Sequence, residues 1–437
     1  MNIIIAGAGR VGFRLAKILS STNHVTVIDH NQNALQRLQE SLDILTLFGN
    51  IEDPATYRQI VDEEADIFIA VTDSDETNLI STMMIDDTIK VQRKFIRLRN
   101  TYFSHSNIKE KLGISETIFP LQRTSETVAS LLAYPKANNV KQFNDTDFKL
   151  ISVRASNPIE VTNLLDQSCQ IIGIERNKHF FVPDKEIEIQ KDDLVYFFGK
   201  SEPILHLSDM LETLEFKSIE RCVIFGAGDV GVSIAQSLKA NNRQIKVIDK
   251  DIELCKRADE ALQGTALTIN SKYGTEELFE EEGLAHADMM IAATDNDEYN
   301  IIKCLEAREH GIEKVVAIIN ELEYYNLMHA LGIVVVRGPK MNAYNEIMER
   351  IYSSNIVMER KFCGGKANIY LRKIFHDSPL ISKNIAAFKE HQSVAYLLRD
   401  EVLYLLDKPM PAKEGDMIIV FCTSEISPKV KRWIYGL

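Results

Sequence analysis

The sequence has 437 residues, of which 45% are apolar and 26% charged. This composition is typical of a globular protein with two to four domains of about 100–200 residues each, and it excludes disordered and fibrous classes. The formal net charge of −13 repels phosphate backbones, and no basic stripe offsets it, so we expect no nucleic-acid partner.

The cysteine pattern and the apolar runs indicate a cytoplasmic protein. Six cysteines occur without any Cys-x-x-Cys pair, which favours reduced thiols over a disulfide framework or a zinc site. The apolar run at the start lacks the basic residues and the length of a signal peptide. Charges or glycines interrupt every longer run, so we expect no membrane-spanning helix and no direct lipid insertion.

Short apolar runs alternate with helical patterns in the first third of the sequence. The predicted strands lie at 3–6, 25–29, 44–48, 67–71 and 95–98. Alternating strands and helices predict a parallel, doubly wound sheet whose strands are buried on both faces.

A Gly-x-Gly-x-x-Gly motif follows the first predicted strand and opens a predicted helix at 11–19. In this context the first glycine permits a tight turn, the second lets a pyrophosphate approach the backbone, and the third lets the helix pack on the strand. The phosphate then meets the amides at the helix N-terminus. The predicted cofactor contacts are Gly7, Ala8, Gly9, Arg10, Val11 and Gly12.

Asp29 ends the second predicted strand, where an acid in this arrangement accepts hydrogen bonds from ribose hydroxyls and disfavours a 2′-phosphate. NAD is therefore preferred over NADP. The alternative is that Asp29 only caps or solvates the strand end. Arg10, inside the glycine loop, is a candidate bidentate donor to phosphate oxygens.

Two further groups lie at the carboxyl ends of later strands. Thr72 and Asp73 follow the fourth predicted strand and are candidate ligand contacts, because this edge of a parallel sheet collects ligands. Asp75 fits better as a capping acid of the helix that begins there. Arg97 and Arg99 close the fifth strand on one face; they either reach ligand phosphates or form a solvated strand end.

The rest of the sequence repeats this plan. Alternating strands at 148–153 and 194–199 follow the first block, and similar strands at 368–372 and 417–421 follow its repeat. The repeated site residues are Gly226, Gly228, Asp229, Gly231, Asp249, Thr294 and Asp295. Because Asp229 replaces Arg10 and residues 316–320 include no basic residue, we expect the second site to be weaker or more selective for anions.

These motifs resemble the TrkA family, the cytoplasmic regulatory subunits of Trk potassium uptake systems. The resemblance rests on Ile-Ile-Ala-Gly-Ala-Gly-Arg-Val-Gly near the start, on Val-Thr-Asp-Ser-Asp-Glu-Thr-Asn at 71–78 and on Phe-Ile-Arg-Leu-Arg-Asn at 95–100. It implies two doubly wound, Rossmann-like RCK (KTN) nucleotide-binding domains, each followed by a small α+β RCK C-terminal lobe. The implied ranges are 1–138 and 219–352 for the nucleotide-binding domains and 139–214 and 355–437 for the lobes.

The resemblance further implies a homotetrameric ring beneath a membrane potassium-translocating subunit of the TrkH/TrkG type. Binding of NAD(H), and of ATP or ADP, would bias gating allosterically, and the protein would lie at the inner face of the membrane through its partner. One departure is Gly49-Asn50, where the family commonly has Gly-Asp. Asn50 can hydrogen-bond ribose or base but has no charge, so the nucleotide preference of the family does not carry over.

A nucleotide-binding fold does not by itself establish catalysis. A dehydrogenase would need a positioned general acid or base facing the nicotinamide, and the sequence contains no paired histidine motif, nucleophile elbow or P-loop lysine. We therefore expect a regulatory protein with no catalytic or metal-binding residues. The alternative is an NAD-dependent oxidoreductase.

Overall fold

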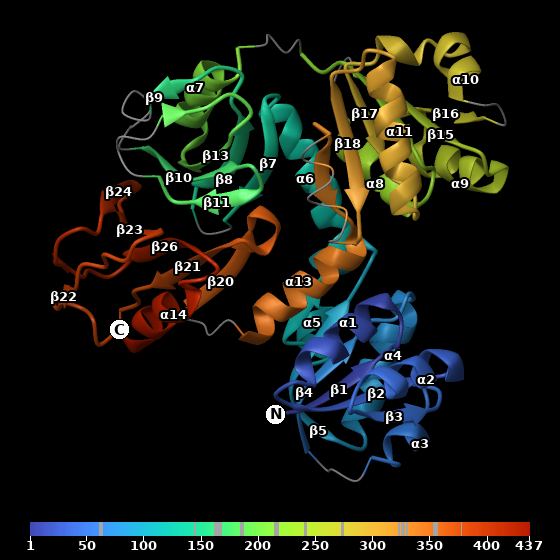
Figure 1. The fold of residues 1–437 in the computed structure, drawn as a ribbon. Coiled ribbons are helices and arrows are strands. Elements are labelled where there is room, and N and C mark those ends of the chain that lie inside the picture. The colour runs from blue at the N-terminus through green and yellow to red at the C-terminus, as the bar shows by residue number, and fades with distance from the viewer. Residues whose placement is uncertain are drawn as a thin grey trace. The chain divides into compact units, whose positions relative to one another are not determined.

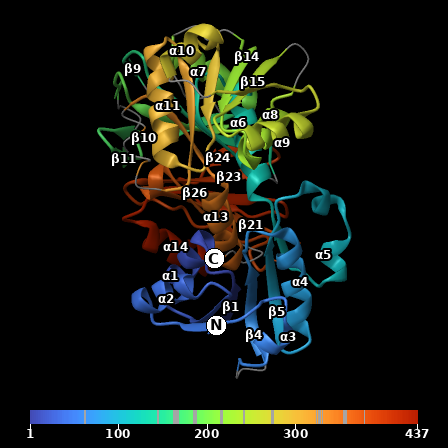
Figure 2. The same cartoon turned by 90° about the vertical axis from the view of Figure 1, so that its right-hand side faces the viewer.

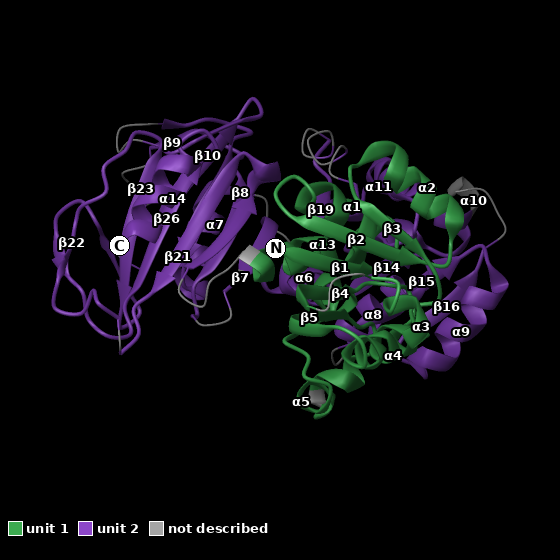
Figure 3. Ribbon diagram, turned by 90° about the horizontal axis from the view of Figure 1, so that it is seen from below, with its two compact units in different colours: residues 1–125, 337–351 green, residues 126–336, 352–437 purple. Residues whose placement is uncertain are grey.

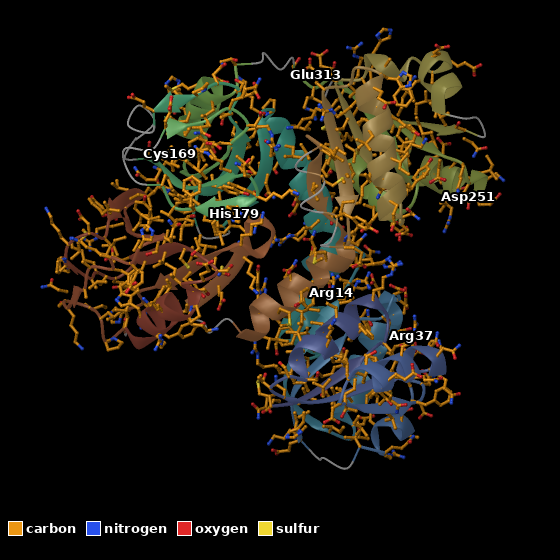
Figure 4. All side chains as sticks on the ribbon, in the orientation of Figure 1. Arg14, Arg37, Cys169, His179, Asp251 and Glu313 are labelled. Atoms are coloured by element: carbon orange, nitrogen blue, oxygen red, sulfur yellow. The ribbon has the colours of Figure 1, made fainter. Side chains whose placement is uncertain are left out.

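The computed structural model describes residues 1–60, 64–143, 146–160, 168–183, 188–213, 218–239, 243–271, 275–321, 324, 328, 331–352, 357–376 and 378–437. The chain forms two compact units, shown in Figure 3. Unit 1 contains Met1–Ser125 and Arg337–Ile351, and unit 2 contains Glu126–Val336 and Tyr352–Leu437.

Unit 1 is built on a six-stranded parallel sheet in the order β3-β2-β1-β4-β5-β6. Its strands are β1 (Asn2–Ala6), β2 (His24–Asp29), β3 (Leu45–Phe48), β4 (Glu64–Ala70), β5 (Lys90–Arg97) and β6 (Glu116–Ile118). The predicted doubly wound sheet is therefore confirmed. Strand β5 begins well before its predicted start, because its first four residues alternate between exposed and half-buried positions and carry little apolar signal.

Helices cover both faces of this sheet. They are α1 (Arg10–Leu19), α2 (Gln32–Ser41), α3 (Pro54–Tyr57), α4 (Asp75–Asp86), η1 (Thr101–His105), α5 (Ile108–Lys111), the start of α6 (Pro120–Ala133), and α13 (Pro339–Tyr352). Figure 2 shows α1 and α2 on one side of the strands and α3 and α4 on the other. The first face shares an apolar core with α13, and the second packs on Tyr57 and Ile85.

Unit 2 contains a second parallel sheet with the same strand order, β16-β15-β14-β17-β18-β19. Its strands are β14 (Arg221–Phe225), β15 (Gln244–Asp249), β16 (Leu267–Asn270), β17 (Met289–Ala292), β18 (Lys314–Ile319) and β19 (Val334–Arg337). The described helices around it are α8 (Asp229–Ser237), α9 (Ile252–Leu262), α10 (Thr275–Glu281), η3 (Leu284–His286) and α11 (Asp297–Glu309).

Unit 2 also contains two antiparallel lobes, visible as the green and red sheets of Figure 1. The first has β7 (Ala137–Gln142), β8 (Lys149–Arg154), β9 (Ile159–Glu160), β10 (Cys169–Arg176), β11 (His179–Phe181), β12 (Glu188–Ile189), β13 (Leu194–Gly199) and α7 (Ser201–Leu211). The second has β20 (Val357–Phe362), η5 (Cys363–Gly365), β21 (Ala367–Lys373), β22 (Asn384–Ile385), β23 (Ser393–Arg399), β24 (Val402–Leu405), β25 (Met410–Pro411), β26 (Met417–Thr423) and α14 (Ser427–Gly436).

The two lobes share an aromatic core. The rings of Phe198 and Phe421 lie 5.1 Å apart, and those of Phe180 and Phe362 lie 5.3 Å apart in an edge-to-face arrangement. Such pairs add to the stability gained from apolar burial alone. The lobe boundaries predicted at 214 and 355 lie outside the described residues.

Each parallel sheet shares its core with a helix from the other half of the sequence. In unit 1, Ala343, Ile347 and Ile351 of α13 join the core of the first sheet. In unit 2, Val128 and Leu131 of α6 join the core that includes the second sheet. The described residues include no helix that is long and apolar enough to cross a membrane.

Candidate functional site

The first and third glycines of each motif are required by the backbone. Gly7 and Gly226 have φ values of +113° and +116°, which side-chain-bearing residues rarely adopt. A Cβ on Gly12 would lie 1.9 Å from the Gly7 carbonyl oxygen, and one on Gly231 would lie 1.8 Å from that of Gly226. Close packing of helix and strand therefore depends on these four residues.

The second glycine of each motif leaves an open helix N-terminus. Gly9 and Gly228 are the N-caps of α1 and α8, and neither helix has a side-chain cap among the described residues. By contrast, Asn31 caps α2 through the Ala34 amide. A Cβ on Gly9 or Gly228 would contact nothing within 4 Å. First-turn amides without an acceptor, facing open space, make a site for an anion.

Asp29 and Asp249 fasten the two glycine loops. Asp29 Oδ2 accepts the Ala8 amide at 2.6 Å, and its Oδ1 accepts the Asn31 amide at 2.8 Å. Asp249 repeats this with the Ala227 amide at 2.8 Å. The Ala8 amide is thus engaged within the loop. Each carboxylate oxygen retains a lone pair with which it can accept a ribose hydroxyl.

Two buried asparagines, which the sequence analysis did not single out, fix the loops after β4 and β17. Asn78 Oδ1 accepts the amide and the hydroxyl of Thr72 at 2.9 and 2.7 Å, and its Nδ2 donates to the Arg97 carbonyl. Asn300 does the same for Thr294 and Ile318. The sequence did carry a signal for this role: in both copies an asparagine stands six residues after the threonine.

Asp75 is not the N-cap of α4, but it lies in the first turn of that helix, where an acid was expected. Ser74 caps α4 by accepting the Thr77 amide, and Asp75 is the first residue of the helix. Its carboxylate accepts the amides of Arg99 and Asn100, each at 2.8 Å. Asp75 therefore ties the start of α4 to the end of β5, next to the candidate site.

Arg97 and Arg99 point to the same side of the sheet edge, as the strand alternation predicts. Arg97 Nη1 lies 3.2 Å from Asp73 Oδ1, and Arg99 Nη2 lies 3.1 Å from the same oxygen. Partial burial acts to raise the pKa of the Asp73 carboxyl, but the two guanidiniums hold it below its usual value. The prediction of a solvated strand end does not fit Arg97, whose side chain is only 6% exposed.

In the described part of the second copy, the two positions of the arginines hold uncharged residues. The hydrogen bonds of Asn300 and Asp297 show that Ile318 and Asn320 occupy the positions of Arg97 and Arg99. Asp229 and Asp295 are exposed residues at the N-terminus of α8 and in the loop after β17. The described part of the second site is therefore more acidic than the first.

The remaining predicted residues lie at the same edge of the first sheet. Arg10 is exposed at the first position of α1. Asn50 is exposed after β3, and its Oδ1 accepts the Glu52 amide at 3.0 Å. The Gly49 amide donates to the Asp29 carbonyl at 3.1 Å, so Asn50 lies close to Asp29. Its counterpart Lys272 lies outside the described residues.

Comparison with known domain families shows which family the chain belongs to. The sequence matches the TrkA-N domain over residues 3–120 and again over 222–339, and the TrkA-C domain over residues 159–212. The chain belongs to the TrkA family.

Relatives named TrkA match most of the chain. The chain is 27% identical over 440 residues to the "Trk system potassium uptake protein TrkA" of Halomonas elongata, covering 96% of this chain and 95% of that protein. It is 29% identical over 365 residues to a TrkA homolog of Archaeoglobus fulgidus, covering 82% of each.

Solved structures with the same fold include RCK domains. The GsuK RCK domain superposes with a TM-score of 0.62 at 17% identity, covering 100% of this chain and 95% of that one. The GsuK channel bound to NAD superposes with a TM-score of 0.63 at 17% identity, covering 100% and 79%. At this identity the likeness establishes the fold alone.

The second lobe carries the same internal ion pair as the first. Arg176 Nη2 lies 2.6 Å from Asp193 Oδ2, and Arg399 Nη2 lies 2.7 Å from Asp416 Oδ2. Both aspartates are buried. In each lobe the pair joins a strand to the turn before the next long strand, because the aspartate also accepts the amide of Gln190 or Lys413.

The cysteines are free and buried, as expected of reduced thiols. Burial raises the pKa of the Cys222 and Cys422 thiols to about 12, so neither is a ready nucleophile. Among the described residues there is no group of three or more His, Cys, Asp or Glu side chains that could hold a metal ion.

Proposed function

We propose that the chain is a TrkA-type regulatory subunit that binds NAD(H), and also ATP or ADP, at the first glycine loop. The observation that carries this proposal is the uncapped N-terminus of α1 at Gly9, with Asp29 and two arginines at the same sheet edge. Amides of Gly9, Arg10 and Val11 would hold a diphosphate, and Asp29 would accept ribose hydroxyls.

The second glycine loop would bind nucleotide more weakly. It has the same backbone geometry, with Gly226, Gly228 and Gly231 in the same roles, and Asp249 in place of Asp29. However, Asp229 stands where the first site has Arg10, and the carboxylate of Asp295 remains while Ile318 and Asn320 replace Arg97 and Arg99. Repulsion of phosphate by these carboxylates lowers its affinity for a nucleotide.

The partner we propose is a membrane potassium-translocating subunit of the TrkH/TrkG type. Several relatives are named Trk system potassium uptake proteins, and this supports a role in the same process. We infer a homotetrameric ring of RCK units in the cytoplasm, held at the inner face of the membrane through its partner. The proposed domains remain 1–138, 139–214, 219–352 and 355–437.

Nucleotide binding would bias a ring with two conformations, provided that the ligand binds them with different affinity. Moving a 1:99 equilibrium to 99:1 requires about 5.5 kcal/mol of differential binding. Several equivalent sites in one ring could supply this jointly. Electron microscopy of the ring with NADH, ATP and ADP tests the proposal; one unchanged conformation with all three ligands would contradict it.

Calorimetry tests the site itself. Asp29→Arg should abolish NADH binding, because it removes the ribose acceptor and adds bulk beside the loop. Asp249→Arg in the second copy is the matched control and should leave the tighter binding event in place. Unaltered NADH binding by Asp29→Arg would refute the assignment.

The proposed role is regulatory, with no catalytic residue. Relatives are named for potassium uptake rather than for a reaction, which supports this. An NAD-dependent oxidoreductase would instead consume NADH in the presence of a carbonyl substrate. Steady NADH absorbance over a panel of carbonyl compounds is the expected result.

A further inference from the structure

One carboxylate oxygen holds two arginines at the first glycine loop. Asp73 Oδ1 lies within 3.2 Å of both Arg97 Nη1 and Arg99 Nη2. The Asp73 side chain is 82% exposed, whereas that of Arg97 is 6% exposed. An exposed carboxylate thus pairs with a buried cation. Asp73 can rotate toward solvent, but Arg97 then requires another anion in its place.

Asp73 does not satisfy Arg97 fully. The Nε atom of Arg97 is buried and has no hydrogen-bond partner among the residues that the structure describes. A guanidinium has five N–H donors in a planar fork that suits a bidentate oxyanion. Buried donors without acceptors are unfavourable and rare in folded proteins. The Arg97 guanidinium therefore has donor capacity for an acceptor with more oxygens than Asp73 supplies.

This cluster lies against the glycine loop. Arg97 Nη1 is also 3.4 Å from the Thr72 carbonyl oxygen. A Cβ built on Gly7 would lie 3.2 Å from the Thr72 amide nitrogen. Thr72 therefore bridges the loop and the arginine, and an anion on the first turn of α1 would come close to the guanidinium.

The second copy keeps the acid and omits the arginines. Asp295 corresponds to Asp73, but Ile318 and Asn320 stand in place of Arg97 and Arg99. A carboxylate whose function was to contact a sugar or to shape the loop would not need the arginines. Their pairing with Asp73 is a property of the first site alone.

We propose that Asp73 is an internal competitor for the phosphate-binding arginines of the first site, and that it sets which nucleotide binds there. This inference rests on the proposed nucleotide binding at that loop. The ligand must displace Asp73 from Arg97 and Arg99 before its phosphate can use them. Asp73 thus acts against binding, opposite to the ligand contact that the sequence suggested.

Ligands differ in how strongly Asp73 opposes them. A terminal phosphate, as in ADP or ATP, carries a charge of about −1.5 to −2 and three free oxygens. In NADH each phosphorus is esterified on both sides, carries a single charge and is held mainly by the loop amides. Competition by Asp73 therefore weakens ADP and ATP binding more than NADH binding, and so favours the dinucleotide.

Calorimetry on the full chain tests this with Asp73→Asn, an isosteric change at an exposed side chain. ADP and ATP should bind roughly three- to tenfold more tightly in the variant, as expected when a charge-assisted pair is removed. NADH affinity should change less, so that the ratio of ADP to NADH affinity rises. Asp73→Ala is the second variant, and Asp295→Asn is the matched control that should leave the ratio unchanged.

Each result has a definite meaning. An unchanged ratio in both Asp73 variants, with nucleotide still bound, overturns this inference alone. Loss of ATP affinity that appears only with Mg²⁺ would identify Asp73 as a metal ligand and also overturn it. If the unsubstituted chain binds none of ADP, ATP and NADH, the proposed function fails as well.

Discussion

Arg93 and Lys314 occupy equivalent positions on the fifth strands of the two parallel sheets, and each donates to carbonyls at the end of a helix. Arg93 pairs in register with Ile67 and Lys314 with Met289. The Arg93 guanidinium donates to the carbonyls of residues 350 and 351 at 2.7 and 3.4 Å, where α13 ends. The Lys314 ammonium donates to the carbonyls of residues 135 and 137 at 2.6 and 2.7 Å, just after α6. A cation at a helix C-terminus satisfies free carbonyls and opposes the helix dipole.

Lys314 should make stability depend on pH. Burial lowers the pKa of its ammonium from 10.5 to about 7, although the two carbonyl acceptors favour the charged form and reduce this shift. Between pH 7 and pH 10.5 the unfolded chain binds more protons than the folded chain. The free energy of unfolding therefore rises with pH, by at most about 1.4 kcal/mol per pH unit. Below pH 7 both states are protonated and this dependence ends.

Lys314→Met should reduce the increase in the free energy of unfolding between pH 7 and pH 10. The measurement is the difference in melting temperature between Lys314→Met and the unsubstituted chain from pH 6 to 10. The advantage of the variant should be largest near pH 6–7 and shrink toward pH 10. A difference that stays constant over this range would show that Lys314 titrates normally.

Gly9→Ala should separate binding from folding. The residue has ordinary φ, and its Cβ would enter open space, so the free energy of unfolding should stay within about 0.5 kcal/mol. The methyl group would stand where a phosphate approaches, and NADH should bind about tenfold more weakly, a loss of about 1.4 kcal/mol. Denaturant unfolding and calorimetry measure the two effects; Gly228→Ala provides the comparison at the second loop.

Gly12→Ala should reduce the stability of the fold as well as nucleotide binding. Its Cβ would collide with the Gly7 carbonyl oxygen, so α1 must shift away from β1. We expect a loss of about 2–3 kcal/mol in the free energy of unfolding, together with weaker binding. Normal stability for this variant would mean that α1 can move at little cost, which contradicts the close packing described above.

Asn78→Ala should destabilise the first sheet edge by about 2–4 kcal/mol, because one buried and two partly buried backbone groups of Thr72 and residue 97 each lose a hydrogen bond. Asn300→Ala should have a similar effect through Thr294 and Ile318. Thermal unfolding measures both. A negligible effect in either variant would mean that water replaces the amide there.

The sequence predicted the parallel, doubly wound sheet and the positions of the glycine loops well, since apolar periodicity and the Gly-x-Gly-x-x-Gly spacing are local signals. It could not show which sheet the helix at 339–352 covers, because an amphipathic pattern shows that one helix face is buried but not which surface it packs against. Nor could it show that Asp73 pairs with Arg97, as that contact depends on the relative placement of β4 and β5. The buried roles of Asn78 and Asp75 were missed for the same reason.

The shared cores of α13 with the first sheet and of α6 with the second also bear on the ancestry of the chain. Each sheet is covered by helices of its own half and, in addition, by one helix that the other half supplies. Before the duplication, a single half-length polypeptide could have buried that surface only by exchanging this helix with an identical copy. The present chain has the pattern that such a helix-exchanged pair would have if its two copies were joined. Fusion freed the two sites to diverge, so that one could gain arginines and the other carboxylates.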